Sequence, residues 1–222
     1  TAESFFREYL PQNITKDLDF NSLEICKDKF VSKKMARYYS DILYHIRLKG
    51  MDAFIYMLIE HKSRPERFIG IQFLKYMVRI WELYLKQDED ARTLPVILPI
   101  LIYNGPTKWR VNTRFIHLFD APGEVKDYIP DFKYNLHDIS HMPDEKIRGD
   151  ILLRILFLAF KYISKPALRD KLPGILRLFF ELSDKGSASE YLEVLLRYLS
   201  GSAKHLAEDE LKETVTQTFE KG

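Results

Sequence analysis

Three side chains in the first third of the sequence, Asp41, Glu60 and Lys62, are of the types that catalyse phosphate ester hydrolysis. Two carboxylates can hold a hard divalent cation, and Mg²⁺ is the expected cofactor, with Mn²⁺ or Ca²⁺ as alternatives. The cation would lower the pKa of a bound water molecule and polarise a phosphoryl group. Lys62 would orient that water or neutralise charge that develops on phosphate. These residue types therefore predict metal-dependent phosphoryl chemistry.

The two acidic residues lie in segments that read as neighbouring strands. Positions 38–48 and 54–60 are rich in Tyr, Ile and other strand-forming residues, and positions 49–52 read as a turn between them. A four-residue turn would make Leu48 face Ala53 across an antiparallel pair. This register predicts that the aspartate lies directly opposite the glutamate.

Opposed carboxylates would need a positive partner. Directly facing β-carbons are only ~5 Å apart, and two like charges at that separation are unfavourable unless a cation lies between them. Lys62 follows Glu60 by two residues, so the period of a strand places its ammonium on the same face. A one-residue bulge would instead move Asp41 opposite Ile59 or His61 and turn it away from Glu60. The alternative to a catalytic site is an exposed hairpin end where Lys62 neutralises two surface carboxylates.

The rest of the chain predicts an α/β fold. Apolar spacing predicts a central helix over 65–88, and a continuous apolar run over 94–103 predicts a strand covered on both faces. Further short elements are expected as a helix at 2–10 and strands at 22–26 and 134–139. Helices are expected over 144–163, 172–182, 188–199 and 203–219, separated by Pro166, Pro173, Gly186 and Gly201. We therefore expect a core over 1–142 and a helical extension over 143–222 that packs on it.

Composition excludes several classes of protein. Lys and Arg number 34 against 32 Asp and Glu, so a polybasic nucleic-acid binder is excluded and any positive surface must be local. The single Cys26 cannot form an internal disulfide, and no signal peptide is recognised at the start, so a reducing cytoplasm is expected. No segment reaches the ~20 apolar residues that cross a bilayer. No glycine-rich phosphate loop is found, so no nucleotide cofactor is expected.

Four segments taken together resemble the recombination-promoting nucleases, a family also described as transposases. The segments are 39–44, 58–63, 74–82 and 94–105, and the likeness extends in order over roughly residues 1–163. This family belongs to the PD-(D/E)xK nuclease superfamily. The resemblance implies a restriction-endonuclease-like mixed sheet flanked by helices, and a helical C-terminal extension follows it here. It also implies a cytoplasmic bacterial DNA endonuclease that depends on a divalent metal and is linked to recombination or transposition.

The resemblance implies a role for each residue that matches a motif. Asp41 falls on the metal-binding aspartate of the superfamily, and Glu60 and Lys62 fall on its acid-x-lysine motif. Gln72 and Tyr76 match the Gln-x-x-x-Tyr motif of the RecB-like branch, and their spacing places them on one helix face. They would contact the reacting water or a phosphate. Without the resemblance, a polar pair on a solvated helix edge explains them equally well.

Basic residues on both sides of the acidic pair predict a DNA-binding rim. Such side chains hold phosphates without reading bases. Each one taken singly is equally well explained as a solvated loop residue. The residues concerned are Lys33, Lys34, Arg37, Arg64 and Arg67.

These patterns together predict an endonuclease that hydrolyses phosphodiester bonds in DNA. The alternative is a catalytically inactive module of the same fold that binds protein or DNA. A homodimer is a further expectation, because one site cuts one strand at a time, and the helical extension is the expected contact. No membrane partner is expected.

Overall fold

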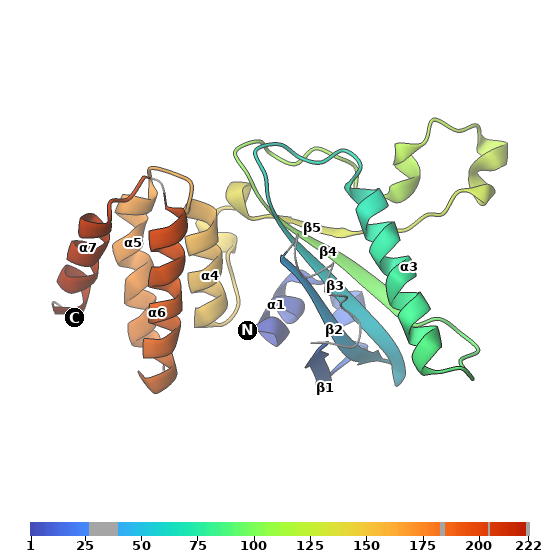
Figure 1. The fold of residues 1–222 in the computed structure, drawn as a ribbon, viewed down its shortest axis with the longest axis horizontal. Coiled ribbons are helices and arrows are strands. Elements are labelled where there is room, and N and C mark those ends of the chain that lie inside the picture. Colours follow the sequence, from blue (N-terminus) through green and yellow to red (C-terminus); the bar gives the residue numbers. More distant parts are fainter. Residues whose placement is uncertain (27–39, 183–184, 204, 221–222) are drawn as a thin grey trace. The chain divides into compact units, whose positions relative to one another are not determined.

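The chain divides into two compact units. The structure is a computed structural model that describes residues 1–26, 40–182, 185–203 and 205–220. One unit comprises Tyr9–Asp138, and the other comprises Thr1–Glu8 with Ile139–Gly222 (Figure 1). The predicted division after residue 142, and the packing of the helical extension on the core, stay predictions.

A mixed sheet is the centre of the unit Tyr9–Asp138. Among the described residues the strand order is β1-β2-β3-β4-β5. Strand β2 is antiparallel to both β1 and β3, and β4 is parallel to both β3 and β5. Parallel neighbours need a crossover, and α3 (Ile69–Gln87) provides it between β3 and β4. The strands are β1 (Leu18–Ile25), β2 (Ser40–Leu48), β3 (Met51–His61), β4 (Val96–Asn104) and β5 (Asn135–Asp138). The predicted α/β fold, a mixed sheet with flanking and C-terminal helices, is confirmed.

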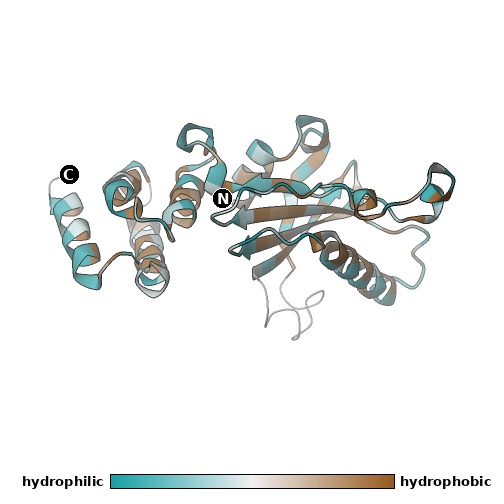
Figure 2. Cartoon of the chain, turned by 90° about the horizontal axis from the view of Figure 1, so that it is seen from above, coloured by the Kyte–Doolittle hydropathy of each residue, from teal (hydrophilic) through white to brown (hydrophobic). Residues whose placement is uncertain are grey.

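One hydrophobic core of this unit lies between the sheet and α3. Alternate residues of β3, including Tyr56 and Leu58, face the helix and are almost fully buried. The helix buries Phe73, Tyr76 and Ile80 against them, at the spacing of one helix face. In Figure 2 the central strands are the most hydrophobic part of the sheet. The apolar pattern of the sequence thus determines which face of α3 meets the sheet.

The β2–β3 turn is tighter than expected. Leu48 pairs with Met51, so only Lys49 and Gly50 form the turn. Both residues have positive φ, at 52° and 80°, as in the two-residue turns whose twist matches that of antiparallel strands. Glycine adopts this conformation at no steric cost, which favours the short turn over a four-residue loop. The predicted register, with Asp41 directly opposite the glutamate, is therefore wrong.

The second compact unit is helical. Its core includes Ile155, Leu172, Leu176 and Leu199, contributed by α4, α5 and α6. Over the described parts of the chain, the α-helices besides α3 are α1 (Ala2–Tyr9), α2 (Gln12–Thr15), α4 (Ile151–Tyr162), α5 (Leu168–Arg177), α6 (Lys185–Ser202) and α7 (Glu208–Glu220). Short 3-10 helices are η1 (Phe115–Leu118), η2 (Gly123–Tyr128), η3 (Ile139–His141), η4 (Asp144–Lys146) and η5 (Leu178–Glu181). No helix among the described residues has the length and apolar character to span a membrane.

Two predicted helix limits in this unit are wrong. The helix expected from Asp144 begins at Ile151, because Asp150 caps it by accepting a hydrogen bond from the Leu153 amide at 2.8 Å. Asp144 lies in η4, where its carboxylate binds Lys161 and Tyr162. Pro173, expected between helices, lies inside α5, whose apolar face is buried in the core of the unit. The first limit is thus set by the local cap at Asp150, and at Pro173 burial of the helix face outweighs the local signal.

Candidate active site

Asp41 and Glu60 lie on the sheet face that α3 covers. Asp41 pairs with Leu58, so Tyr56 and Glu60 are its two diagonal neighbours on β3. Diagonal neighbours across an antiparallel pair have α-carbons ~7–8 Å apart, with β-carbons somewhat closer. The two carboxylates are therefore a diagonal pair on one face, and the tyrosine lies on the other side of the aspartate.

The Asp41 carboxylate is buried and lacks a hydrogen bond of good geometry. Neither of its oxygens has a hydrogen-bond partner among the described residues, and the same is true of the Tyr56 hydroxyl and the Gln72 side-chain nitrogen. Burial, the largest effect, raises the pKa of Asp41 to about 6. The nearby hydroxyls of Tyr56 and Tyr76 lower this pKa, whereas the Glu60 charge raises it. Buried polar atoms without partners cost free energy, so these atoms mark a place where a further polar group fits.

Glu60 is buried but paired with Lys62. Only 3% of Glu60 is exposed, and its Oε1 lies 2.7 Å from the Lys62 Nζ. The same ammonium lies 3.3 Å from Oε2 of Glu66 in the loop after β3. Its hydrogen bond to Glu60 is the main reason that the pKa of Lys62 is raised. Lys62 is therefore positively charged at neutral pH and is bound directly to one of the two carboxylates.

The segment after β4 holds the Lys62 backbone in place. The Tyr103 hydroxyl lies 2.9 Å from the Thr107 carbonyl and 3.4 Å from the Lys62 carbonyl, which are both acceptors. The Thr107 hydroxyl donates to the Ser63 carbonyl at 3.4 Å. Gly105 approaches this region so closely that a β-carbon there would collide with the Tyr103 hydroxyl and the Lys62 carbonyl oxygen. Glycine at this position thus lets the β4 end support the lysine.

The helix contributes Gln72 and Tyr76 to the same region. Tyr76 is almost fully buried, and its ring lies 5.2 Å from that of Tyr56, measured between centroids. Gln72 is half-buried one turn earlier on α3, with its side-chain nitrogen inaccessible to solvent. The i and i+4 spacing therefore points both residues of the predicted motif to the sheet, and Tyr76 is near enough to affect the pKa of Asp41.

The donor set suits an open cation site. Among the described residues, no group of three or more His, Cys, Asp or Glu side chains is placed to hold a metal ion. Two carboxylates, Asp41 and Glu60, are available, and the first has unsatisfied oxygens. Mg²⁺ is commonly bound by one or two carboxylates while it keeps several waters or takes phosphate oxygens. The residues present therefore fit such an ion better than one that needs a closed protein cage.

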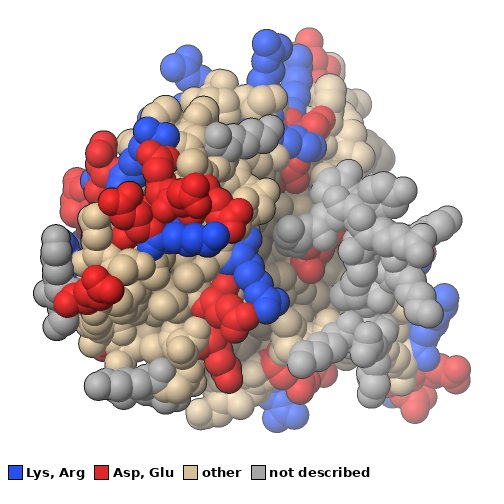
Figure 3. Space-filling view, turned by 60° about the vertical axis from the view of Figure 1, so that its left-hand side comes forward, with Lys and Arg blue, Asp and Glu red and all other residues tan. Residues whose placement is uncertain are grey.

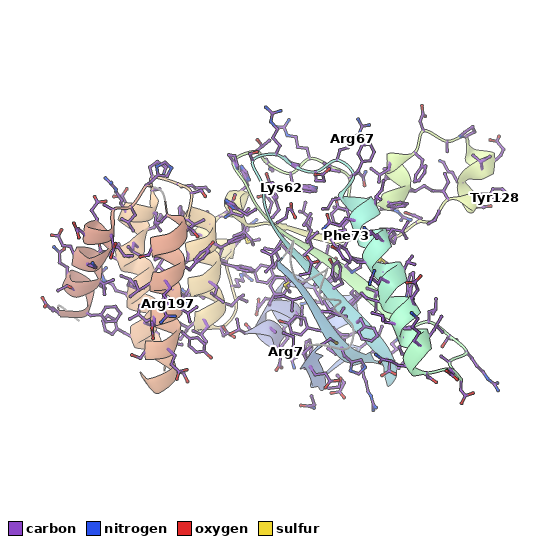
Figure 4. The ribbon with its side chains drawn as sticks, in the orientation of Figure 1. Arg7, Lys62, Arg67, Phe73, Tyr128 and Arg197 are labelled. Atoms are coloured by element: carbon purple, nitrogen blue, oxygen red, sulfur yellow. The ribbon has the colours of Figure 1, made fainter. Side chains whose placement is uncertain are left out.

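Two of the five predicted DNA-binding residues can be placed. Arg64 and Arg67 are exposed in the loop between β3 and α3. Figure 4 shows Arg67 at the end of the sheet where Lys62 lies. The Arg67 guanidinium lies 5.6 Å from the centre of the Phe68 ring. On the face drawn in Figure 3, basic and acidic side chains are interspersed. The other three, Lys33, Lys34 and Arg37, lie outside the described residues.

Sequence reasoning missed Tyr56, Glu66 and Gly105. The strand period already placed Tyr56 on the face of Glu60, four residues later, so alternation could have identified it. Glu66 follows Lys62 by four residues, but no helix or strand pattern there indicates that they meet. Gly105 had no local signal, because the backbone oxygen that excludes a β-carbon belongs to Lys62, which is distant in the sequence.

Comparison with known proteins adds a family and several relatives. A family described as "Putative transposase, YhgA-like" matches residues 1–190. The chain is 27% identical over 188 residues to Recombination-promoting nuclease RpnC of Escherichia coli strain K12, which covers 84% of this chain and 62% of that protein. It is 27% identical over 202 residues to Recombination-promoting nuclease RpnD of Escherichia coli O157:H7, with 90% and 75% covered.

A third relative bears a different name. The chain is 27% identical over 200 residues to the "Inactive recombination-promoting nuclease-like protein RpnE" of Escherichia coli strain K12, with 90% of this chain and 65% of that protein covered. The chain thus spans only 62% to 75% of the length of these relatives. No solved structure matches the chain.

Proposed function

Because the chain belongs to the YhgA-like transposase family, we propose that it is a divalent-metal-dependent DNA endonuclease that acts in recombination. The observation that carries the proposal is the buried Asp41 carboxylate, which has no hydrogen-bond partner among the described residues and lies diagonal to the ion-paired Glu60. Relatives named recombination-promoting nucleases support DNA as the substrate. The predicted cytoplasmic location stays part of the proposal.

Asp41 and Glu60 would hold the cation. When bound, a divalent ion would lower the pKa of a coordinated water molecule and stabilise negative charge on the phosphate. Asp41 contributes two unsatisfied oxygens, whereas Glu60 contributes a carboxylate that Lys62 already orients. The diagonal offset leaves more room between the carboxylates than direct opposition would, which suits an ion that retains water ligands.

Lys62 supplies the fixed positive charge. Its ammonium is held by Glu60 and Glu66, yet 39% of the side chain stays exposed, so a phosphate can approach it. In the proposed reaction it neutralises charge that develops on the phosphate and orients the attacking water. The backbone contacts of Tyr103 and Gly105 keep this lysine in position.

Gln72 and Tyr76 act as supporting polar groups in this proposal. The Gln72 amide has an unused buried nitrogen that can donate a hydrogen bond to a water or a phosphate oxygen. The Tyr76 hydroxyl lies near Asp41 and lowers its pKa, so it favours the ionised form that binds a cation. Arg64 and Arg67 would contact the DNA backbone beyond the site, together with Lys33, Lys34 and Arg37.

A catalytically inactive module is the second candidate. The relative whose name includes the word inactive favours it, because this chain is as similar to that protein as to the named nucleases. Under this alternative, the same fold would bind DNA or protein without hydrolysis. The presence of Asp41, Glu60 and Lys62 in one region favours the active form.

Plasmid nicking separates the two candidates. Supercoiled plasmid is incubated with the protein and Mg²⁺, Mn²⁺ or Ca²⁺, with EDTA as the metal-free control. We expect nicking that needs the metal and falls at least ~100-fold in Asp41→Asn and in Lys62→Met. A matched control is Asp90→Asn, which changes an exposed carboxylate after α3 and should leave the rate unchanged. Nicking that persists in both site variants would overturn the assignment, and its absence in the natural sequence would favour the inactive module.

A further inference from the structure

One face of α3 carries apolar side chains that no described part of the chain covers. Ile71, Val78 and Leu85 are 54%, 42% and 45% exposed and recur every seven residues. They lie on the side of the helix opposite Phe73 and Ile80, which are fully buried under the sheet. Hydrophobic and hydrophilic segments alternate along this helix in Figure 2. Single exposed apolar residues are ordinary on a protein surface, but three in line along one helix form a stripe suited to another helix.

Charged residues beside this stripe indicate the direction of the second helix. Lys75 and Glu82 are both exposed. Lys75 comes four residues after Ile71, and Glu82 comes four residues after Val78. If a copy of α3 packs antiparallel about an axis close to Val78, Lys75 meets Glu82 of the partner subunit. Ile71 then lies level with Leu85 of the partner subunit. The charges of Lys75 and Glu82 are therefore complementary under two-fold symmetry.

A parallel arrangement lacks this complementarity. In a parallel helix pair, Lys75 and Glu82 would face the residues of the partner helix that come immediately before each stripe residue. Here the preceding positions are Gly70, Met77 and Tyr84, which carry no charge at neutral pH and are largely buried against the sheet. Lys75 and Glu82 would have no opposite charges to meet.

We infer that this face of α3 is a homodimer interface in which two copies of the helix pack antiparallel. The interface lies on the sheet unit and is distinct from the helical extension, to which sequence reasoning assigned dimerisation. The inference does not depend on nuclease activity, because it rests only on exposure, spacing and charge. A single 19-residue helix pair is small for an interface, so a dimer with a micromolar dissociation constant is expected. Such a dimer would place two sheet units in one particle.

Cross-linking tests the geometry of the pair. In a Cys26→Ser background of the full chain, Val78→Cys should give a covalent dimer with a short bis-maleimide reagent, because the two-fold axis brings both copies together. Leu85→Cys is the matched control, since two such residues would lie on the order of 20 Å apart in the antiparallel pair and should not react. Val194→Cys, on α6 and 63% exposed, controls for random collision. Efficient linking through Leu85→Cys would indicate a parallel pair and overturn the inference.

Charge reversal tests the same contact without cysteine. By sedimentation velocity, Lys75→Glu and Glu82→Lys alone should each weaken dimerisation about tenfold, because each places like charges across the axis twice. The double variant should recover the natural affinity. A chain that is monomeric at about 100 µM, or a double variant no better than the single ones, would overturn the proposal. Circular dichroism of each variant confirms that it is folded.

Discussion

Replacing Asp41 with asparagine should stabilise the metal-free protein at alkaline pH. Because the folded state raises the pKa of Asp41 from 3.8 to about 6, the folded chain holds this proton more strongly than the unfolded chain. The Asp41 contribution to stability is therefore lost as the pH rises from about 4 through about 6. An asparagine side chain at this position carries no charge, so the variant avoids this loss.

The expected gain follows from that shift. At about 1.4 kcal/mol per pKa unit, the rise in pKa corresponds to roughly 3 kcal/mol in the free energy of unfolding above about pH 7. The carboxylate oxygens are buried, but the Asp41 residue as a whole is half-buried and solvent screens part of its charge, so we expect about 1–2 kcal/mol. Urea denaturation in EDTA at about pH 8 and about pH 4.5 measures the difference between Asp41→Asn and the natural sequence. This difference should be largest at the alkaline pH and should shrink at the acidic one.

Saturating metal should make the natural sequence more stable than Asp41→Asn. A cation that binds only the folded state stabilises it by about 2.7 kcal/mol at about 100 times its dissociation constant, and Asp41→Asn should lose most of that effect with Mn²⁺. Asp90→Asn is the control and should match the natural sequence throughout. The reasoning is refuted if Asp41→Asn is less stable than the natural sequence without metal at the alkaline pH, with the same difference at the acidic pH.

Three other changes test the supports of the site and of the helical unit. Gly105→Ala should lower the free energy of unfolding by about 2 kcal/mol and slow plasmid nicking, because the added β-carbon would collide with its neighbours. Gly123→Ala is the control and should change neither, since a β-carbon there meets open space. Equal changes in stability and nicking for the two variants would contradict the packing argument. Lys62→Met should still bind Mn²⁺ in calorimetry but should nick plasmid at least ~100-fold more slowly. Loss of Mn²⁺ binding in this variant would contradict the proposal that Lys62 acts on the water and the phosphate and does not hold the metal. Burial alone would raise the pKa of Asp144, but hydrogen bonds, chiefly from Lys161, lower it to about 2. Asp144→Asn should therefore cost about 2 kcal/mol in urea denaturation at about pH 7, and the cost should vanish as the pH falls from about 4 to about 2; a cost independent of pH would contradict this.

The order of strands and helices could be read from the sequence because it depends on local patterns. The apolar run of β4 requires cover on both faces, and the helical spacing of α3 requires one buried side. The limits of an element could not be read from the sequence where a local signal competes with burial. Pro173 reads as a helix break, yet the burial of Leu172 and Leu176 keeps it inside α5.

The relative position of the two acidic residues depends on the turn between β2 and β3. Sequence alone indicated Asp41, Glu60 and Lys62 as candidates, because hard acids and an amine at strand spacing are informative residue types. It could not choose between a two-residue and a four-residue turn, and this choice changes the partner of Asp41 from Glu60 to Leu58. A change of two positions keeps the face of a strand, since side chains alternate with a period of two. A change of one would have separated the two acids.

The sequence by itself therefore determined the types of chemical group and the face on which they lie, because both follow from residue identity and strand period. Only the tertiary structure decided which atoms are paired and which are not. Among the described residues, it buried the Asp41 oxygens beneath α3 without a hydrogen bond, while it left the Lys62 ammonium bound to Glu60. Burial and hydrogen bonding are set by segments far apart in the chain, so no local pattern encodes them.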